Sequence, residues 1–597
     1  MIQGLYFTSN SIQLENKEEI TWLELTPPIN NSDIYYHDFV AEKSFIDTKV
    51  FIIECELNDE QKGLSFATHL RFEGFKQPIY LVGRLSKDNL RSGNPNSLLN
   101  TKLIHYEDIG DIDDLSIDYT NTTDLKIRTA IEDGLIIISK PETTTNHTIS
   151  NEWGAFKLAQ YTNTLYAVNN NTLVKEKAKT LYFKYLCLKD NVDFSATQSD
   201  EPIKIDCEDK NVLLIDDQAD KGWEDIFKII LDTNNFTSVP ISFLGSGKDE
   251  NKIFTDAENL ISTNEYDVVL LDLRLKSSDK SNTAGFNDIT NFSGYQLLKK
   301  IKEKNKGIQV VIFTASNKAW NMKALLETGA DGYYIKQSPD FNYGNDYAKQ
   351  NFEAFHEEMK IALERSSFLK WFWKHTDELI NHLDSEYSHE SIDDNFVESV
   401  KLSLNYAYDT IENYHSYVSD NQKFLNYAFI SYCNLIEFVV VGLFDVHDTD
   451  EQDPSRSYYL KKINNEAPQI EIITNVNQPP NTPSYETLLM FEKKQTDPND
   501  KSIILQHPYY KLQTNKSEQT IKNFEDRNSL KILAGYAAIL LLRYNLFSHQ
   551  DIQDYETLKE KRHKFMHSNE NQPNNISLTD CKNMFRMVYA VLKGEKI

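Results

Sequence analysis

Four short apolar runs between residues 211 and 337 constrain the fold of this chain more than any other feature. They are NVLLIDD (Asn211–Asp217), YDVVLLDLRL (Tyr266–Leu275), GIQVVIFTAS (Gly307–Ser316) and DGYYIKQ (Asp331–Gln337). Such runs, which lack helical spacing, are typical of strands that are buried on both faces of a parallel sheet. Helix-compatible segments alternate with them: Trp223–Leu231, Ile253–Thr263, Tyr295–Glu303 and Ala319–Thr328. This alternation predicts a doubly wound parallel sheet.

The predicted strands carry reactive side chains near their C-terminal ends. In chain order these are Asp216, Asp217, Asp272, Thr314 and Lys336. Parallel strands end at one edge of a sheet, where open α/β folds bind their ligands. Three carboxylates suit Mg²⁺, and a hydroxyl and a lysine can surround the oxygens of a phosphoryl group. Because one aspartate at a strand end is commonly a turn residue, the prediction depends on the whole set.

The segment from about residue 211 to 339 therefore resembles the receiver domain of response regulators. The resemblance implies that Asp272 accepts a phosphoryl group from a histidine kinase. It assigns Asp217 and Asp272 to a Mg²⁺ ion, with the carbonyl of Arg274 as a third ligand and Asp216 acting through water. It also implies that Thr314 and Lys336 hold the phosphoryl group, and it places Tyr333 at the aromatic switch position.

Two features depart from the receiver pattern. The family usually has proline directly after the lysine, whereas here Gln337 and Ser338 come before Pro339. The family also reaches its loop glycine soon after the acceptor, whereas Gly294 follows Asp272 by 22 residues. The inserted residues are polar and rich in Gly, Ser and Asn, so they predict a loop over the site. This loop either gates the site or is a tolerated surface insertion.

The length and composition of the chain limit its class. Its 597 residues predict three or four domains, and its five cysteines form no CxxC pair, as expected in a reducing cytoplasm. No signal peptide is evident, and the longest apolar run, Ile532–Leu542, is too short to span a membrane. The net charge of −27 argues against general coating of nucleic acid. We therefore expect a cytoplasmic protein that does not bind membranes.

Residues 1–205 predict an α/β region with a helical extension. KVFIIECEL (Lys49–Leu57) reads as a buried strand with Glu54 in the position of Asp272, and PIYLVGRLS (Pro78–Ser86) reads as a later strand with Gly83 in the position of Thr314. The region is either a degenerate receiver without acceptor chemistry or a generic α/β module. The extension predicts a strand over 134–139 and helices over 152–160 and 172–188. In it, His147 and Trp153 mark either a docking surface or ordinary packing.

Residues 206–344 form the predicted receiver domain, and residues 345–597 predict a helical domain. Asn345 to Val441 contains neither Gly nor Pro, and Leu425–Phe444 and Leu530–Phe547 are apolar enough to be core helices. A polar insertion over about 445–527 contains several prolines and predicts little regular structure.

The end of the chain has the opposite charge balance from the rest. From Lys559 to Ile597 there are eight Lys and Arg against four Asp and Glu, and Arg562, His563 and His567 lie in a helical pattern. This spacing resembles the motif of HEPN ribonucleases. The resemblance implies metal-independent RNA cleavage, for which a histidine transfers protons and an arginine faces the phosphate.

Helix geometry adds a constraint to this motif. Positions five apart lie roughly 140° apart around a helix, so one copy of Arg562 and His567 makes a poor site unless the helix ends or bends. The family completes its site with two protomers, which predicts a homodimer. Alternatively the basic residues are a solvated face, or His563 and His567 bind zinc, although no third ligand is evident. The polar Asn434 and Glu437 interrupt an apolar helix, and Glu437 is a candidate partner of Arg562.

The sequence thus favours a two-component response regulator in which phosphorylation of Asp272 controls a ribonuclease. Such an effector suits stress or phage defence, where RNA damage halts growth. The main alternative is a regulator without catalysis, in which the helical domain only binds a partner or dimerises. A transcription factor is the weakest alternative, because no basic recognition helix is evident.

Overall fold

The structure is a computed structural model of the whole chain. It describes residues 4–8, 20–25, 32–55, 62–108, 126–165, 172–192, 201–280, 289–315, 319–339, 347–386, 394–443, 458–461, 469–476, 484–494, 504–509, 532–566 and 576–597, apart from short gaps within several of these ranges. The chain divides into two compact units. The first contains residues 1–304 and 309–363, and the second contains residues 305–308 and 364–597.

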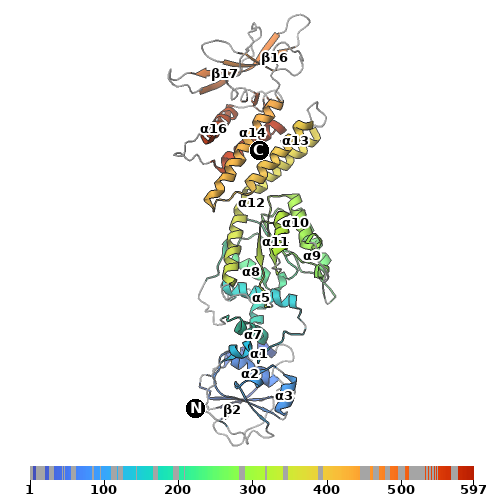
Figure 1. The fold of residues 1–597 in the computed structure, drawn as a ribbon, viewed down its shortest axis with the longest axis vertical. Coiled ribbons are helices and arrows are strands. Elements are labelled where there is room, and N and C mark those ends of the chain that lie inside the picture. The colour runs from blue at the N-terminus through green and yellow to red at the C-terminus, as the bar shows by residue number, and fades with distance from the viewer. Residues whose placement is uncertain are drawn as a thin grey trace. The chain divides into compact units, whose positions relative to one another are not determined.

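The first unit begins with a five-stranded parallel sheet (Figure 1). Its strands are β1 (Gly4–Thr8), β2 (Ile20–Glu24), β3 (Val50–Glu54), β4 (Ile79–Gly83) and β5 (His105–Asp108), in the order β2-β1-β3-β4-β5. Three helices lie between the strands: α1 (Ser32–Glu42), α2 (Lys62–Phe72) and α3 (Lys87–Gly93). The two strands predicted around Glu54 and Gly83 are present, and side chains from both fill a common core with those of α2.

Four helices follow this sheet. They are α4 (Ile127–Glu132), α5 (Asn146–Tyr161), α6 (Thr172–Ala178) and α7 (Leu181–Lys189). α5 contains the helix predicted over 152–160, the helix predicted over 172–188 is divided into α6 and α7, and α4 was not predicted. The strand predicted over 134–139 is wrong. This segment is irregular, with Ile136 buried and Leu135 and Ile137 exposed. Its apolar run, Leu135–Ile138, is continuous, but among the backbone hydrogen bonds of these residues only the one from Ile137 N–H reaches another segment, at the Asn96 carbonyl.

A second five-stranded parallel sheet follows in the same unit. Its strands are β7 (Val212–Ile215), β9 (Phe236–Ser238), β12 (Val268–Leu271), β13 (Gln309–Thr314) and β14 (Gly332–Ile335), in the order β14-β13-β12-β7-β9. Short pairs flank it: β6 (Ile205–Asp206) with β8 (Leu231–Asp232), and β10 (Phe243–Leu244) with β11 (Gly247–Lys248). The four strands predicted from the apolar runs are all present.

Helices lie on both faces of this second sheet (Figure 1). They are α8 (Trp223–Ile230), α9 (Glu250–Thr263), α10 (Ser293–Lys304), α11 (Ala319–Glu327) and the first part of α12 (Tyr347–Glu386). On one face the ring of Trp223 packs edge-on against Phe313, which stacks on Tyr334. The strands are buried on both sides, which explains why they read as continuous apolar runs.

The second unit is mainly helical. Besides the end of α12 it contains α13 (Asp394–Glu412), α14 (Gln422–Leu443), α16 (His549–Met566) and α17 (Leu578–Lys593). α14 packs against both α13 and α17. Ser577 begins α17 with a capping box, in which its hydroxyl accepts the Asp580 N–H and the Asp580 carboxylate accepts the Ser577 N–H. The structure is thus mixed α/β with parallel sheets, followed by a helical C-terminal region.

The expectation of little regular structure over 445–527 is wrong. Four strands form an antiparallel sheet there in the order β15-β16-β17-β18. They are β15 (Tyr458–Lys461), β16 (Gln469–Val476), β17 (Ser484–Lys494) and β18 (Ile504–Tyr509). The first four residues of β16, QIEI, alternate between polar and apolar residues, a pattern that is typical of a strand. The prolines that suggested an irregular segment lie mostly in the connections between the strands.

Among the described residues, α14 alone has the length and composition to cross a membrane. Half of the residues in its most apolar window are buried within the protein. A core helix of a helical domain has the same properties, so this finding is weak support for a membrane span.

Candidate functional site

Three carboxylates meet at the carboxyl edge of the second sheet. Asp216 and Asp217 directly follow β7, and Asp272 directly follows β12. β7 and β12 are parallel neighbours with Ile215 opposite Leu271, so this register brings the acids together. One oxygen from each carboxylate lies within 4.8 Å of the others, and all three residues are buried. The sequence predicted this cluster from the strand ends alone.

Lys336 completes the cluster from the end of β14. Its ammonium group donates hydrogen bonds to Asp216 Oδ2 at 2.7 Å and to Asp272 Oδ2 at 3.1 Å. The side chain is fully buried and lies 4.7 Å from the centre of the Phe313 ring. Its backbone N–H bonds to the Thr314 carbonyl, which fixes β14 against the end of β13. A lysine in this place balances part of the negative charge of the carboxylates.

Burial and charge shift the proton affinities of this group. Burial, opposed by the Lys336 charge and assisted by Asp272, raises the pKa of Asp216 to about 6. Burial alone would lower the pKa of Lys336, but Asp216 and Asp272 raise it. Lys336 therefore stays charged near neutral pH, whereas the pKa of Asp216 is high enough for this carboxyl to take up a proton at mildly acidic pH.

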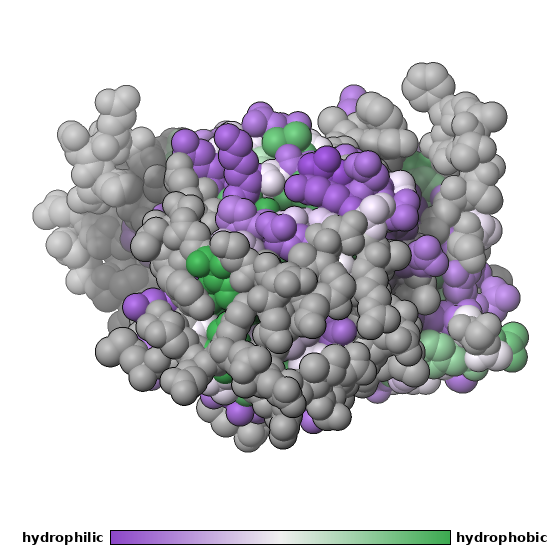
Figure 2. Space-filling model, turned by 90° about the horizontal axis from the view of Figure 1, so that it is seen from below, coloured by the Kyte–Doolittle hydropathy of each residue, from purple (hydrophilic) through white to green (hydrophobic). Residues whose placement is uncertain are grey.

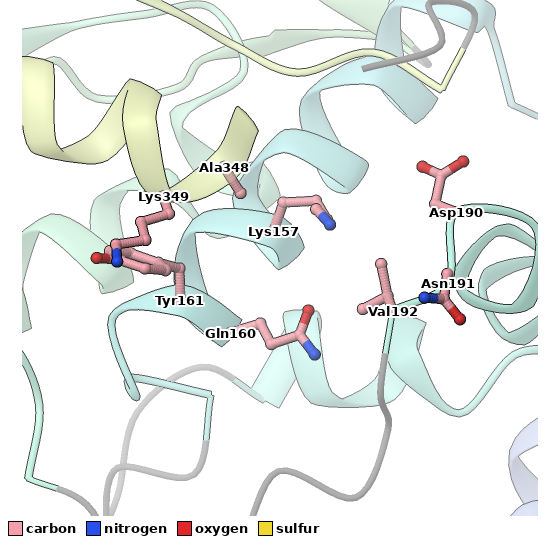
Figure 3. Close-up of a pocket in the computed structure, with 8 residues that line it drawn as sticks. All are labelled: Lys157, Gln160, Tyr161, Asp190, Asn191, Val192, Ala348 and Lys349. Carbon is pink, nitrogen blue, oxygen red and sulfur yellow. The ribbon is translucent and has the colours of Figure 1, made fainter. Parts of the chain in front are cut away.

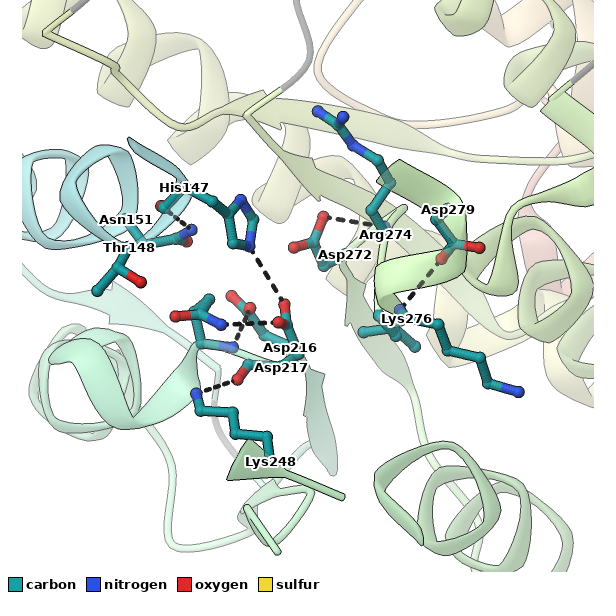
Figure 4. A network of polar contacts seen from close by, with 12 residues as sticks. His147, Thr148, Asn151, Asp216, Asp217, Lys248, Asp272, Arg274, Lys276 and Asp279 are labelled. Carbon is teal, nitrogen blue, oxygen red and sulfur yellow. Dashed lines mark hydrogen bonds and ion pairs between the residues drawn. The ribbon is translucent and has the colours of Figure 1, made fainter. Parts of the chain in front are cut away.

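The surroundings of Asp217 were not predicted. Gln218 donates its side-chain N–H to Asp217 Oδ2 at 2.7 Å, and Lys248 on β11 donates to the Asp217 carbonyl and to Asp220. His147 on α5 places Nε2 3.7 Å from Asp217 Oδ1 (Figure 4). No motif links these residues in the sequence, because they come from separate elements and meet only in the fold.

The other predicted site residues lie around the acids. The Thr314 side chain is buried at the end of β13, whereas Tyr333 on β14 is 42% exposed. The backbone N–H of Arg274 donates to Asp272 Oδ1 at 3.4 Å (Figure 4). Gly294 packs on the acceptor strand, since a Cβ there would lie 2.3 Å from the Asp272 carbonyl oxygen. Gly294, after the long insertion, therefore lies beside Asp272; residues 281–288 of the insertion lie outside the described part.

The acids fit a hard divalent cation. They supply carboxylate oxygens only, which are the ligands that Mg²⁺ prefers. Asp216, Asp217 and Asp272 are the residues that would hold the ion. There it would offset the charge of Asp272 and of an incoming phosphoryl group.

Replacing the buried lysine is expected to destabilise the protein. Lys336→Met leaves the three acids without their buried cation, and we expect a loss of about 3–5 kcal/mol in the free energy of unfolding at pH 8. The loss should be smaller at pH 5, because the folded variant takes up protons that the unfolded chain does not. Urea denaturation in EDTA at both pH values measures this. The control is Lys323→Met, whose side chain is 80% exposed; equal stabilities of the two variants would contradict the expectation.

A second polar cluster lies in the helical unit. Arg562 on α16 donates from Nη1 to Glu437 on α14, and from Nη2 to Asn434 Oδ1 at 3.1 Å. Burial alone would lower the pKa of Arg562, but the hydrogen bond to Glu437 outweighs burial, so the pKa lies above its ordinary value. The predicted partnership of Arg562 with Glu437 is therefore present. His563 is exposed on α16, and His567 lies outside the described residues.

Comparison with known proteins gives no identification. The sequence matches no known protein family, and no curated protein matches it. The geometry of the two clusters is therefore the basis for assigning a function.

No residue predicted for either site lines the cavity shown in Figure 3. This cavity has a volume of about 250 Å³, and its lining includes Lys157, Asp190 and Lys349. The face of the protein shown in Figure 2 is mostly hydrophilic where its residues are described, and its apolar patches are small. Neither the cavity nor this face brings together side chains that suggest a catalytic site.

Proposed function

We propose that the protein is a response regulator in which Asp272 accepts a phosphoryl group from a histidine kinase. The observation that carries the proposal is the buried cluster of Asp216, Asp217, Asp272 and Lys336 at one sheet edge. The strand order β9-β7-β12-β13-β14 follows chain order 2-1-3-4-5, which is the order of receiver-type folds. Residues 206–344 are the proposed receiver domain.

The residues of this edge have separate roles in phosphoryl transfer. An Asp272 oxygen attacks the phosphorus and the donor's leaving group departs, so one P–O bond forms as the donor bond breaks. Asp217 and Asp272 would hold Mg²⁺, with the Arg274 carbonyl as a third ligand and Asp216 acting through water, as the receiver resemblance implies, and the ion would offset the charge of the phosphoryl group. Lys336 and Thr314 bind the transferred oxygens. Tyr333 is the exposed aromatic residue whose position responds to phosphorylation of Asp272.

The first sheet supports a degenerate receiver in the N-terminal region. Its order β2-β1-β3-β4-β5 is also 2-1-3-4-5 in chain order. Glu54, at the end of β3, corresponds in position to Asp272 in the second sheet. Its carboxylate accepts a hydrogen bond of 2.6 Å from the Thr8 hydroxyl. Gly83 ends β4 in place of a hydroxyl residue. This edge therefore has no acceptor chemistry of the kind proposed for Asp272.

The proposed output is a HEPN-type ribonuclease in residues 345–597. Arg562 lies in a polar cluster with Glu437 and Asn434, and the C-terminal part of α16, which is basic from Lys559 on, carries His563 beside it. Arg562 faces the phosphate of RNA, and His567, with His563, supplies the proton transfers. Two protomers complete the site, and no metal is required there. Phosphorylation of Asp272 controls RNA cleavage by changing how the two protomers associate.

A regulator without catalysis is the second candidate. Glu437 and Asn434 already hold the Arg562 guanidinium, which suits a structural arginine as well as a catalytic one. In this case the helical domain dimerises or binds a partner when Asp272 is phosphorylated.

One experiment on the full chain tests the proposal and separates the two candidates. The protein is incubated with radiolabelled acetyl phosphate and Mg²⁺, and then with total RNA. We expect label on the protein and a change in RNA cleavage between the labelled and unlabelled forms. Label with intact RNA under both conditions would favour the regulator without catalysis. Absence of label, with EDTA-treated protein as the baseline, would contradict the receiver assignment.

A further inference from the structure

The helix α5 lies against the proposed phosphorylation site and inserts one side chain into it. Asn151 is fully buried, and its Oδ1 accepts hydrogen bonds from Lys336 Nζ at 2.9 Å and from Trp223 Nε1 at 3.2 Å. Figure 4 shows α5 bringing Asn151 and His147 to the same edge as the acids. Asn151 thus binds the lysine that the proposed function assigns to the phosphoryl group.

Further contacts extend along one face of α5. The hydroxyls of Ser150 and Ser338 lie 2.8 Å apart, and a Cβ on Gly154 would lie 3.1 Å from the Gln337 carbonyl oxygen. Together with His147, these residues have the spacing of a single helix face. The glycine allows the backbone of α5 to approach the chain directly after Lys336. α5 is therefore seated on the site over two turns.

In this structure, with α5 docked, the reacting groups of the site are buried. Asp272 is only 3% exposed and Lys336 is 0% exposed. A phosphoryl donor must bring its phosphorus to within bonding distance of an Asp272 oxygen. The aspartate cannot be reached in this way while it is buried.

Asn151 and a phosphoryl group on Asp272 would compete for the hydrogen-bond donors of Lys336. An ammonium group has three N–H donors, and here they reach Asp216, Asp272 and Asn151. A phosphoryl oxygen on Asp272 needs one of them. Asp216 and Asp272 are charged and belong to the same sheet edge, whereas Asn151 is neutral and comes from α5. Asn151 is therefore the acceptor that a phosphoryl oxygen displaces most readily.

We propose that α5 is an intramolecular plug, so that docking of α5 and phosphorylation of Asp272 exclude each other. The inference rests on the proposed receiver function, and it adds a partner for the site from within the chain. A kinase or small phosphoryl donor acts on the open form, and the phosphorylated protein holds α5 away from the sheet edge.

A reversible covalent lock tests the plug. In the double variant Ser150→Cys/Ser338→Cys the two sulfurs lie within reach of a disulfide. The five native cysteines are buried, so they compete little for oxidation. We expect the oxidised full-length protein to take up label from acetyl phosphate at least about tenfold more slowly than the same protein after reduction. Equal rates in the oxidised and reduced forms would overturn the plug while leaving the receiver assignment intact.

A second variant weakens the docking instead of locking it. Asn151→Ala removes the acceptor of Lys336 and Trp223, and we expect labelling to be about tenfold faster than in the wild type. The matched control is Asn146→Ala, which changes the same residue type at an exposed position of the same helix. An unchanged rate in Asn151→Ala would also count against the plug. Absence of label in every variant, despite normal disulfide formation in the double variant, would instead contradict the receiver function.

Discussion

Replacing Asp272 with asparagine is expected to abolish phosphorylation of the protein. Asparagine keeps the size of the side chain and its burial, but its amide cannot act as the nucleophile. We expect the rate of label uptake from acetyl phosphate to fall by about a hundredfold or more. Acid-stable and base-labile radiolabel on the full-length chain is the measurement, because an acyl phosphate is hydrolysed in base.

Two comparisons make this result specific. Asp232→Asn changes an exposed aspartate on the short strand β8 and should label like the wild type. The variant Asp272→Asn should unfold at a urea concentration close to that of the wild type or above it, because it removes one of three crowded buried acids. Label retained at the wild-type rate would exclude Asp272 as the acceptor.

Replacing Arg562 with alanine is expected to remove RNA cleavage. Loss of one charge-bearing donor at a phosphate typically lowers the rate by about a hundredfold to a thousandfold, and Arg562→Ala removes a whole guanidinium group. Initial rates on a defined RNA strand, with the phosphorylation state held constant, measure the effect. His567→Ala should give a loss of similar size, since the proposed chemistry needs a proton-transfer group as well.

Two further arginine variants provide the controls. Arg562→Lys keeps the charge but loses the two-pronged contact with Glu437 and Asn434, so an intermediate rate is expected. Arg586→Ala removes a different arginine of the same basic end and should cleave normally. If Arg562→Ala cleaves RNA like the wild type, the helical domain does not act through the proposed site. Unchanged circular dichroism in each variant separates these effects from misfolding.

The acid cluster was predictable because each of its members follows a strand that is recognisable by itself. Buried parallel strands read as apolar runs, and their carboxyl ends must meet at one edge. The pairing of Arg562 with Glu437 was predictable for a related reason, since a carboxylate in an apolar helix needs a partner. In both cases a local pattern and one physical rule were sufficient.

The role of α5 could not be predicted in this way. Asn151 and Lys336 are 185 residues apart in the chain, and an asparagine within an apolar helix has no pattern that names its partner. The strands β15–β18 were missed for a different reason, because their polar connections with proline outweighed the alternation within the strands. The segment 134–139 shows the opposite error: it has the apolar run of a buried strand, but it pairs with no strand among the described residues.

The repetition of one strand order in the two parallel sheets has a consequence for the stoichiometry of the modified protein. The described residues that end β1, β3, β4 and β5 in the first sheet are Thr8, Glu54, Gly83 and Asp108, with neither an aspartate pair nor a lysine among them. The second sheet has both. Under the proposed function, modification at Asp272 places one phosphoryl group on each chain and two on a dimer, so that a singly modified dimer is a distinct species.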